Sequence, residues 1–317
     1  MCYGYDGEGA LRRSLGDRGV SRRWLMRGTV AGAAGLAATG MLGAPAAAAE
    51  SGGGHRPGRR VPHDKISIQL YTLRDALGGE PGWDTVVQRL AQYGYPRVEM
   101  AGYYDHTAKQ IRRQFDRLRI RASSSHDGIS ADSAAMRTKF RNAVTLGQRY
   151  VVVPYLNSES LSEWQRWADQ MNEEARVARS YGLRYGYHNH AHEFTIDLGG
   201  GKTPWDVLTS RLDRKLVHLE IDLYWAYTGG VNTGAADPDR FAIDVIRDAP
   251  QLVRQFHVKD RDASTGDMCD LGTGVIDFPR IFDKHRVEEY IVENDTPDVT
   301  PLTSAAVGHL YLEHLRY

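Results

Sequence analysis

The sequence predicts a single-domain α/β protein, a (β/α)₈ TIM barrel, behind an N-terminal leader. Short β-branched or aromatic runs alternate with longer helix-patterned segments across residues 65–317, which is typical of repeated βα units around a parallel sheet. We count eight such units, and about 250 residues is the usual size of this barrel. A doubly wound open sheet is the alternative, but no glycine-rich phosphate turn follows the first expected strand.

The expected strands are mostly continuous apolar runs, as in strands that are covered on both faces. In chain order they span 66–71, 97–100, 121–125, 150–154, 183–188, 217–222, 253–259 and 290–293. The clearest helix between them runs over 160–181, where Leu161, Trp164, Trp167 and Met171 recur at intervals of three or four. Gly182 follows at the position where a left-handed glycine commonly ends a helix.

Residues 1–49 are predicted to be a twin-arginine signal peptide. The pair Arg22 and Arg23 precedes an uncharged Ala/Gly-rich stretch, 28–49, that ends in three alanines. This stretch is only weakly hydrophobic, which disfavours a permanent transmembrane helix. An uncleaved signal that anchors the chain, or a start codon placed upstream of a shorter leader, is the alternative. We expect export to the periplasm, cell wall or medium, without stable membrane insertion after cleavage.

The remaining chain is nearly neutral, because six Arg and three acidic residues of the 40 basic and 40 acidic ones lie in the leader. Such a charge balance does not indicate a nucleic-acid or anionic-membrane partner. Residues 50–64 are rich in Gly, Arg and Pro and are predicted to be a flexible lead-in. Cys269 is the only thiol beyond the leader, so the domain relies on its packed core rather than on a disulfide.

Metal-binding side chains stand at the ends of four consecutive expected strands. His188, Asp222 and Glu293 end the fifth, sixth and eighth strands, and His257 lies two residues before the end of the seventh. Alone, each has a simpler interpretation as a hydrogen-bonded core histidine or a helix-capping carboxylate. Together they predict one divalent-cation site, because the carboxyl ends of barrel strands meet at one rim.

Strand alternation places further side chains at the same rim. His190 shares a side with His188, and Lys259 shares a side with His257. One imidazole suffices for the metal, which leaves His190 as a candidate for proton transfer near neutral pH. The Lys259 ammonium can stabilise an enediolate oxygen, or it forms a salt bridge to Asp260 or Asp262.

Five motifs in order resemble the sugar phosphate isomerase/epimerase family, the xylose isomerase-like barrels that include ketose 3-epimerases and inosose dehydratase. They are Tyr187-His188-Asn189-His190 with Glu193-Phe194, Asp222-Leu223-Tyr224-Trp225, His257-Val258-Lys259-Asp260, Gly272-Thr273-Gly274 with Asp277-Phe278, and Val292-Glu293. The resemblance implies a divalent ion, Mn, Co, Mg or Zn, on Asp222, His257 and Glu293. Ketose 3-epimerases carry a glutamate where this chain has His188, so either His188, which we favour, or Glu193 is the fourth ligand.

The resemblance also implies a substrate site around the metal. Glu99 and His126 match positions where the family places substrate-binding or neighbouring groups, and Trp225 and Tyr71 can form walls for a sugar ring. The implied reaction is isomerisation or epimerisation through an enediolate, with Glu293, His190 and Lys259 as catalytic groups. Export favours an unphosphorylated sugar as the small-molecule partner.

Three other interpretations remain open. The same site suits a 3-keto-glycoside lyase or hydrolase, or a dehydratase. A barrel that binds sugar without catalysis is an alternative from another class. Cleavage of abasic DNA, known in related barrels, is disfavoured by the neutral charge, and the sequence allows an oligomer.

Overall fold

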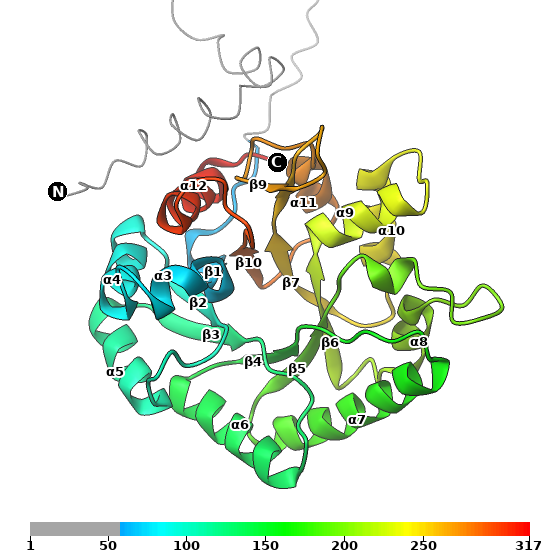
Figure 1. Ribbon diagram of the computed structural model, residues 1–317, viewed down its shortest axis with the longest axis horizontal. Coiled ribbons are helices and arrows are strands. Elements are labelled where there is room, and N and C mark those ends of the chain that lie inside the picture. Colours follow the sequence, from blue (N-terminus) through cyan, green and yellow to red (C-terminus); the bar gives the residue numbers. More distant parts are fainter. Residues whose placement is uncertain (1–57) are drawn as a thin grey trace, which may run out of the picture.

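Eight parallel strands form a nearly closed barrel inside a ring of helices (Figure 1). The computed structural model describes residues 58–317. The expected signal peptide, 1–49, and residues 50–57 of the lead-in lie outside this part of the chain. Within the described part, no helix is both long and apolar enough to cross a membrane. The predicted barrel is confirmed.

The strands follow the order β3-β2-β1-β10-β7-β6-β5-β4 around the sheet. The pairing between β3 and β4, which closes the barrel, is short. His126 and Val152 form one parallel bridge, and the Arg149 amide donates to the Ser123 carbonyl at 2.9 Å. The barrel strands are β1 (Ile66–Gln69), β2 (Arg97–Met100), β3 (Arg121–Ser125), β4 (Tyr150–Val153), β5 (Arg184–His188), β6 (Val217–Asp222), β7 (Val253–Val258) and β10 (Glu289–Val292).

All eight predicted strands are present, with bounds that differ by at most two residues. The largest difference follows β1, where Leu70 and Tyr71 belong to a 3₁₀ helix instead. The Gln69 side chain accepts a hydrogen bond from the Tyr71 amide at 3.0 Å, and this local bond ends the strand. Glu293 lies one residue beyond β10 rather than inside it.

The helices cover the outside of the barrel, and three short 3₁₀ turns lie before β1, after β1 and after β5. The α-helices are α3 (Arg74–Gly78), α4 (Trp83–Tyr93), α5 (Ala108–Leu118), α6 (Ser133–Leu146), α7 (Leu161–Ser180), α8 (Pro204–Arg211), α9 (Leu223–Asn232), α10 (Pro238–Asp248), α11 (Phe278–Lys284) and α12 (Pro301–His314). The 3₁₀ turns are η1 (His63–Lys65), η2 (Leu70–Leu73) and η3 (His192–Phe194). A hairpin of β8 (Asp260–Arg261) and β9 (Met268–Cys269) extends the loop after β7.

The predicted helix over 160–181 is confirmed as α7. Ser160 caps its first turn, with the hydroxyl accepting from the Glu163 amide. Trp164 and Met171 are fully buried against the sheet. Gly182 follows with φ of +77°, the left-handed conformation that favours glycine at this position.

The two faces of the sheet have different chemistry. Outward residues such as Val98 and Phe256 pack against the helices, whereas much of the barrel interior is polar. A Cβ on Gly186 would lie 2.6 Å from the His218 ring, so this glycine makes room for the imidazole inside the barrel. His218 Nε2 lies 2.9 Å from Gln255 Oε1, and the Gln255 amide donates to Glu289 at 3.3 Å. The lower barrel therefore contains a buried hydrogen-bond chain instead of the usual branched apolar layers.

The end of the expected lead-in contacts the C-terminus. Arg59 and Tyr317 exchange two backbone hydrogen bonds, of 2.7 and 3.0 Å. Regular pairing thus begins a few residues before Lys65, the expected start of the barrel.

Candidate active site

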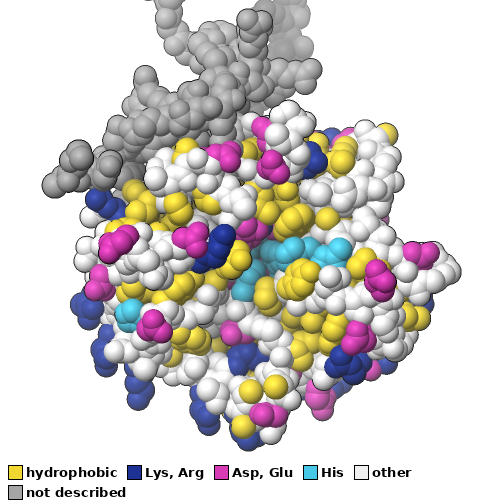
Figure 2. Space-filling view, in the orientation of Figure 1, with side chains coloured by type: hydrophobic (Ala, Val, Ile, Leu, Met, Phe, Trp, Pro, Cys, Tyr) yellow, Lys and Arg dark blue, Asp and Glu magenta, His cyan; other side chains and the backbone are white. Residues whose placement is uncertain are grey.

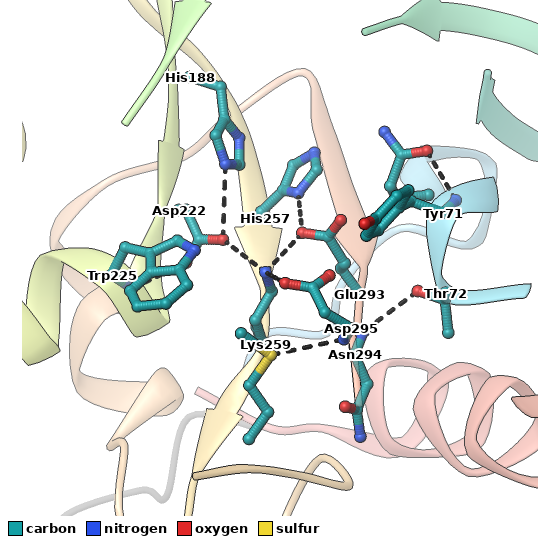
Figure 3. Close-up of polar contacts among 12 residues, drawn as sticks. Tyr71, Thr72, His188, Asp222, Trp225, His257, Lys259, Glu293, Asn294 and Asp295 are labelled. Atoms are coloured by element: carbon teal, nitrogen blue, oxygen red, sulfur yellow. Dashed lines mark hydrogen bonds and ion pairs between the residues drawn. The ribbon is translucent and has the colours of Figure 1, made fainter. Parts of the chain in front are cut away.

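Four neighbouring strands bring His188, Asp222, His257 and Glu293 to one point at the C-terminal rim (Figure 3). One donor atom from each side chain lies within 4.8 Å of the other three. All four are buried, with Glu293 the most exposed at 5%. The strand-end register that the sequence indicated therefore places two imidazoles and two carboxylates around a common centre.

These four side chains fit a divalent cation. Asp222 Oδ1 caps α9 through the Trp225 amide at 2.9 Å, while Asp222 Oδ2 is buried without a hydrogen bond. Burial is the main cause that lowers the pKa of His188 to about 4, so this ring is neutral near pH 7 and has a free lone pair. Burial lowers the pKa of His257, but Glu220 and Glu293 raise it well above its usual value overall. The centre therefore attracts positive charge.

Glu220 and Glu99 lie beneath the two ligand imidazoles. Glu220 Oε1 is 3.3 Å from His188 Nδ1 and 3.1 Å from His257 Nε2. Glu99 Oε1 is 2.7 Å from His257 Nε2. Carboxylates in such positions fix the tautomer and the ring orientation of a metal-binding histidine. They leave His188 Nε2 and His257 Nδ1 directed at the centre.

His126 completes this lower layer. Its ring stacks on His257 with centroids 5.0 Å apart and an interplanar angle of 9°, and its Nε2 lies 2.8 Å from Glu220 Oε1. His126, His188, Glu220 and His257 form a second group whose donor atoms lie within 4.8 Å of one another. The first group is the better candidate for a catalytic cation site, because its four members stand at or within one residue of the ends of their strands, at the rim where barrel active sites lie.

The Lys259 ammonium lies beside the centre. Its Nζ is 2.8 Å from Glu293 Oε2, 3.2 Å from Asp222 Oδ2 and 2.9 Å from Asp295 Oδ2. Burial lowers the pKa of Lys259, but these carboxylates raise it well above its usual value overall. Lys259 is therefore charged and held in place.

Lys259 does form salt bridges, but with Asp222, Glu293 and Asp295 rather than with the predicted Asp260 or Asp262. Asp260 instead accepts hydrogen bonds from the backbone, because its Oδ2 lies 3.0 Å from the amide nitrogens of both Gly272 and Gly274. The Gly272-Thr273-Gly274 segment is thus a turn fixed by a buried carboxylate. Asp262 accepts from Ser264 and Thr265 of its own loop.

Glu193 is not brought to the metal-ligand group. The Tyr187 hydroxyl donates to Glu193 Oε1 at 2.6 Å, and the His190 amide donates to Oε2 at 2.9 Å. These bonds hold the carboxylate within its own loop, where it is fully buried. Of the two alternatives for the fourth ligand, the geometry therefore favours His188.

His190 lies next to the centre, between two aromatic rings. Its ring centroid is 5.2 Å from Trp225 and 5.1 Å from Tyr155. Burial, with further contributions from His188 and Lys259, lowers the pKa of His190 to about 2. This value is far below the neutral range expected from the sequence, so the ring is neutral and is a weak base.

Aromatic side chains surround the opening of the site. Figure 2 shows the histidines at the bottom of a hollow with apolar side chains around it. Tyr71 is 46% exposed and Tyr155 is 53% exposed, and the Arg74 guanidinium lies 4.3 Å from the Tyr71 ring centroid. Lys259 Nζ lies 5.6 Å from the Trp225 ring. Tyr71 and Trp225 therefore lie at the rim, and their role as walls for a sugar ring stays a prediction.

Glu99, another expected substrate-binding residue, lies deeper in the barrel than Tyr71 and Trp225. It is fully buried and accepts a hydrogen bond from the side-chain amide of Gln69 at 2.8 Å. It contacts His257 rather than the opening. Sequence reasoning missed Glu220, Asp295 and Tyr155. Glu220 precedes Asp222 by two residues, so the alternation that grouped His188 with His190 also indicates it.

The fold and the site define a barrel enzyme scaffold, with polar groups gathered where barrel enzymes have their active sites. The chain belongs to the xylose isomerase-like TIM barrel family, whose profile matches residues 80–290. It is 26% identical over 186 residues to inosose dehydratase from Bacillus licheniformis. That match covers 50% of this chain and 56% of the relative, so it spans little more than half of the relative's length.

Solved structures show the same fold. A sugar phosphate isomerase/epimerase from Parabacteroides distasonis has a TM-score of 0.62 at 23% identity, over 80% of this chain and 94% of the other. An L-ribulose 3-epimerase has a TM-score of 0.55 at 16% identity, over 78% and 92%. IolI protein with a bound zinc atom has a TM-score of 0.58 at 14% identity, over 78% and 96%.

Proposed function

We propose that this protein is a divalent-metal-dependent sugar isomerase or epimerase that removes a proton next to a carbonyl. The observation that carries the proposal is the convergence of His188, Asp222, His257 and Glu293 beside the buried ammonium of Lys259. The first four would hold the cation. When bound, a divalent cation acidifies the C–H next to a coordinated carbonyl and stabilises the enediolate.

Glu293 is the proposed proton acceptor. Burial raises the pKa of Glu293, but Lys259 and His257 lower it well below its usual range overall, so the carboxylate is ionised. Lys259 Nζ lies 2.8 Å from Glu293 Oε2, where it can donate a hydrogen bond to a developing oxyanion as well. His190 is proposed to orient the substrate as a neutral hydrogen-bonding ring, because its ring lies beside the centre between Trp225 and Tyr155.

Tyr71 and Trp225 are proposed as the walls for the sugar ring, and an unphosphorylated substrate is favoured. The Lys259 charge is already shared among three carboxylates, which disfavours a phosphate at that position. The signal-like leader supports the same choice, because we propose export by the twin-arginine route. A fusion of residues 1–49 to a reporter should be exported, and the R22K/R23K double variant should block it. Export of both fusions alike would contradict the proposal.

Elimination is the second candidate, and one observation favours it. A neutral His188 stands where ketose 3-epimerases carry a glutamate, so Glu293 is the only glutamate in the ligand group. Abstraction of one proton followed by loss of a β-substituent needs a single base. The similarity to inosose dehydratase points in the same direction. A dehydratase or a 3-keto-glycoside lyase would use this geometry.

The test combines elemental analysis of the purified protein with solvent-deuterium exchange on keto sugars and 3-keto glycosides. We expect about one divalent ion per chain and deuterium incorporation, with Glu293→Gln retaining substrate binding but losing exchange. NMR of the products separates rearranged sugars from eliminated ones. If the protein binds metal and sugar but shows no exchange, it is a sugar-binding barrel rather than an enzyme. Absence of both metal and exchange would refute the proposal.

A further inference from the structure

A second, strongly basic hollow lies at the opposite end of the barrel. It has a volume of about 490 Å³ and is formed around the N-terminal ends of β5, β6 and β7. Arg184 begins β5 and His188 ends it, so about 13 Å of strand separates the hollow from the metal-ligand group. Five of the lining residues are cationic, namely Arg179, Arg184, Arg214, Lys215 and Arg254.

These charges are poorly compensated. Across residues 58–317, Arg179, Arg214 and Lys215 have no carboxylate within 4.0 Å, because they take part in none of the ion pairs there. Arg184 and Arg254 share a single carboxylate, Glu288.

Glu288 is also the partner of Arg149, whose Nη1 lies 2.9 Å from Glu288 Oε2. One carboxylate therefore serves three guanidinium groups. Arg184 Nη1 lies 3.5 Å from Glu288 Oε1, is buried and makes no hydrogen bond. The Arg184 side chain as a whole is 37% exposed and lines the hollow, so an oxyanion bound there would add to its one long ion pair with Glu288.

The rest of the lining is apolar. Leu183, Leu216 and Val217 form part of the wall, and Leu252 stands 59% exposed beside the cations. A ligand suited to this surface carries several oxyanions for the arginines and C–H faces for the leucines. We propose that the hollow binds a glycan chain that bears sulfate or phosphate groups.

A nucleic acid fits the same charges less well. Single strands bind on basic grooves with aromatic stacking platforms, and no Tyr, Trp or Phe lines this hollow. Beyond the leader the chain is close to neutral, unlike most nucleic-acid-binding domains. The anionic glycan would hold the protein near its polymer while the opposite rim of the barrel stays open to substrate.

The test measures binding of the full chain to dextran sulfate by calorimetry, with uncharged dextran as the reference. Arg214 and Lys215 are exposed, so the R214S/K215S double variant should fold normally, and thermal unfolding checks this. We expect it to bind dextran sulfate at least about tenfold more weakly, since removed charges lower polyanion affinity. The R137S/R141S variant, which removes two exposed charges from α6, should bind like the parent.

Each other result overturns the proposal. Equal losses in both double variants would mean nonspecific charge attraction. Inorganic phosphate that binds as tightly as dextran sulfate would indicate a site for a single small anion. Duplex DNA that binds more tightly than dextran sulfate would replace the glycan by a nucleic acid. These binding measurements do not depend on turnover, so the glycan proposal can fail while the catalytic proposal holds, and the reverse.

Discussion

Glu289→Gln should stabilise the protein at alkaline pH and slightly destabilise it at acidic pH. Glu289 is fully buried inside the barrel, where Ser123 and Gln255 donate to it. Burial is the main cause that raises its pKa from the ordinary 4.5 to about 7. The folded state thus binds this proton more tightly than the unfolded state does.

The direction of the pH effect follows from this difference. Below pH 4.5 the group is protonated in both states and carries no penalty, and between pH 4.5 and about 7 the stability falls as pH rises. The full penalty is about 3 kcal/mol, from roughly 1.4 kcal/mol per unit of pKa shift. Strained hydrogen bonds to the new amide offset about 1 kcal/mol, which leaves a gain of about 2 kcal/mol at pH 8.

Thermal unfolding of parent and variant at pH 4 and pH 8 measures this effect. A gain of about 2 kcal/mol corresponds to roughly 4–8 °C in Tm for a domain of this size. The neighbouring Glu288→Gln is the control with opposite sign, because burial raises the pKa of Glu288 but Tyr150 and the adjacent arginines lower it overall. A Tm difference between parent and Glu289→Gln that is the same at both pH values would refute the reasoning.

Three further predictions concern the site and the barrel interior. Glu220→Gln should weaken metal binding by about 10–100-fold, because it disturbs the orientation of His188; an unchanged dissociation constant in a calorimetric metal titration would contradict this. Lys259→Met should lower exchange activity by about 10²-fold or more through loss of an oxyanion donor, while metal content, measured by elemental analysis, should not fall; a variant that exchanges normally would exclude this role. Gly186→Ala should cost about 1–3 kcal/mol in chemical denaturation, because the new Cβ meets the His218 ring at 2.6 Å, and an unchanged midpoint would show that the ring can move aside.

The fold and the four-ligand group follow from features that are local in sequence. Continuous apolar runs gave the strands, and polar residues at the strand ends gave His188, Asp222, His257 and Glu293. Loop residues follow no such pattern, so their positions could not be predicted in this way. Glu193 is close to His188 in sequence, but the Tyr187 hydroxyl and the His190 amide hold it away from the ligand group.

The polar barrel interior could not be predicted either. A strand such as 217–222 alternates toward the inside and the outside, but the sequence does not tell whether an inward Glu220 meets water, a metal or another side chain. That depends on strands that are distant in sequence, since His126 Nε2 lies 2.8 Å from Glu220 across the barrel. The pKa of His190 likewise depends on tertiary burial.

The two carboxylate oxygens of Asp222 have different roles, and this determines which substitutions can test the site. One of its oxygens caps helix α9 and the other faces the proposed cation site. Truncation to alanine would remove a helix cap together with a ligand, so loss of metal in that variant would be confounded with fraying of α9. Asp222→Asn keeps an oxygen for the cap and changes only the other side. Hydrogen exchange in the first turn of α9 therefore serves as an internal gauge of whether the helix has survived the substitution.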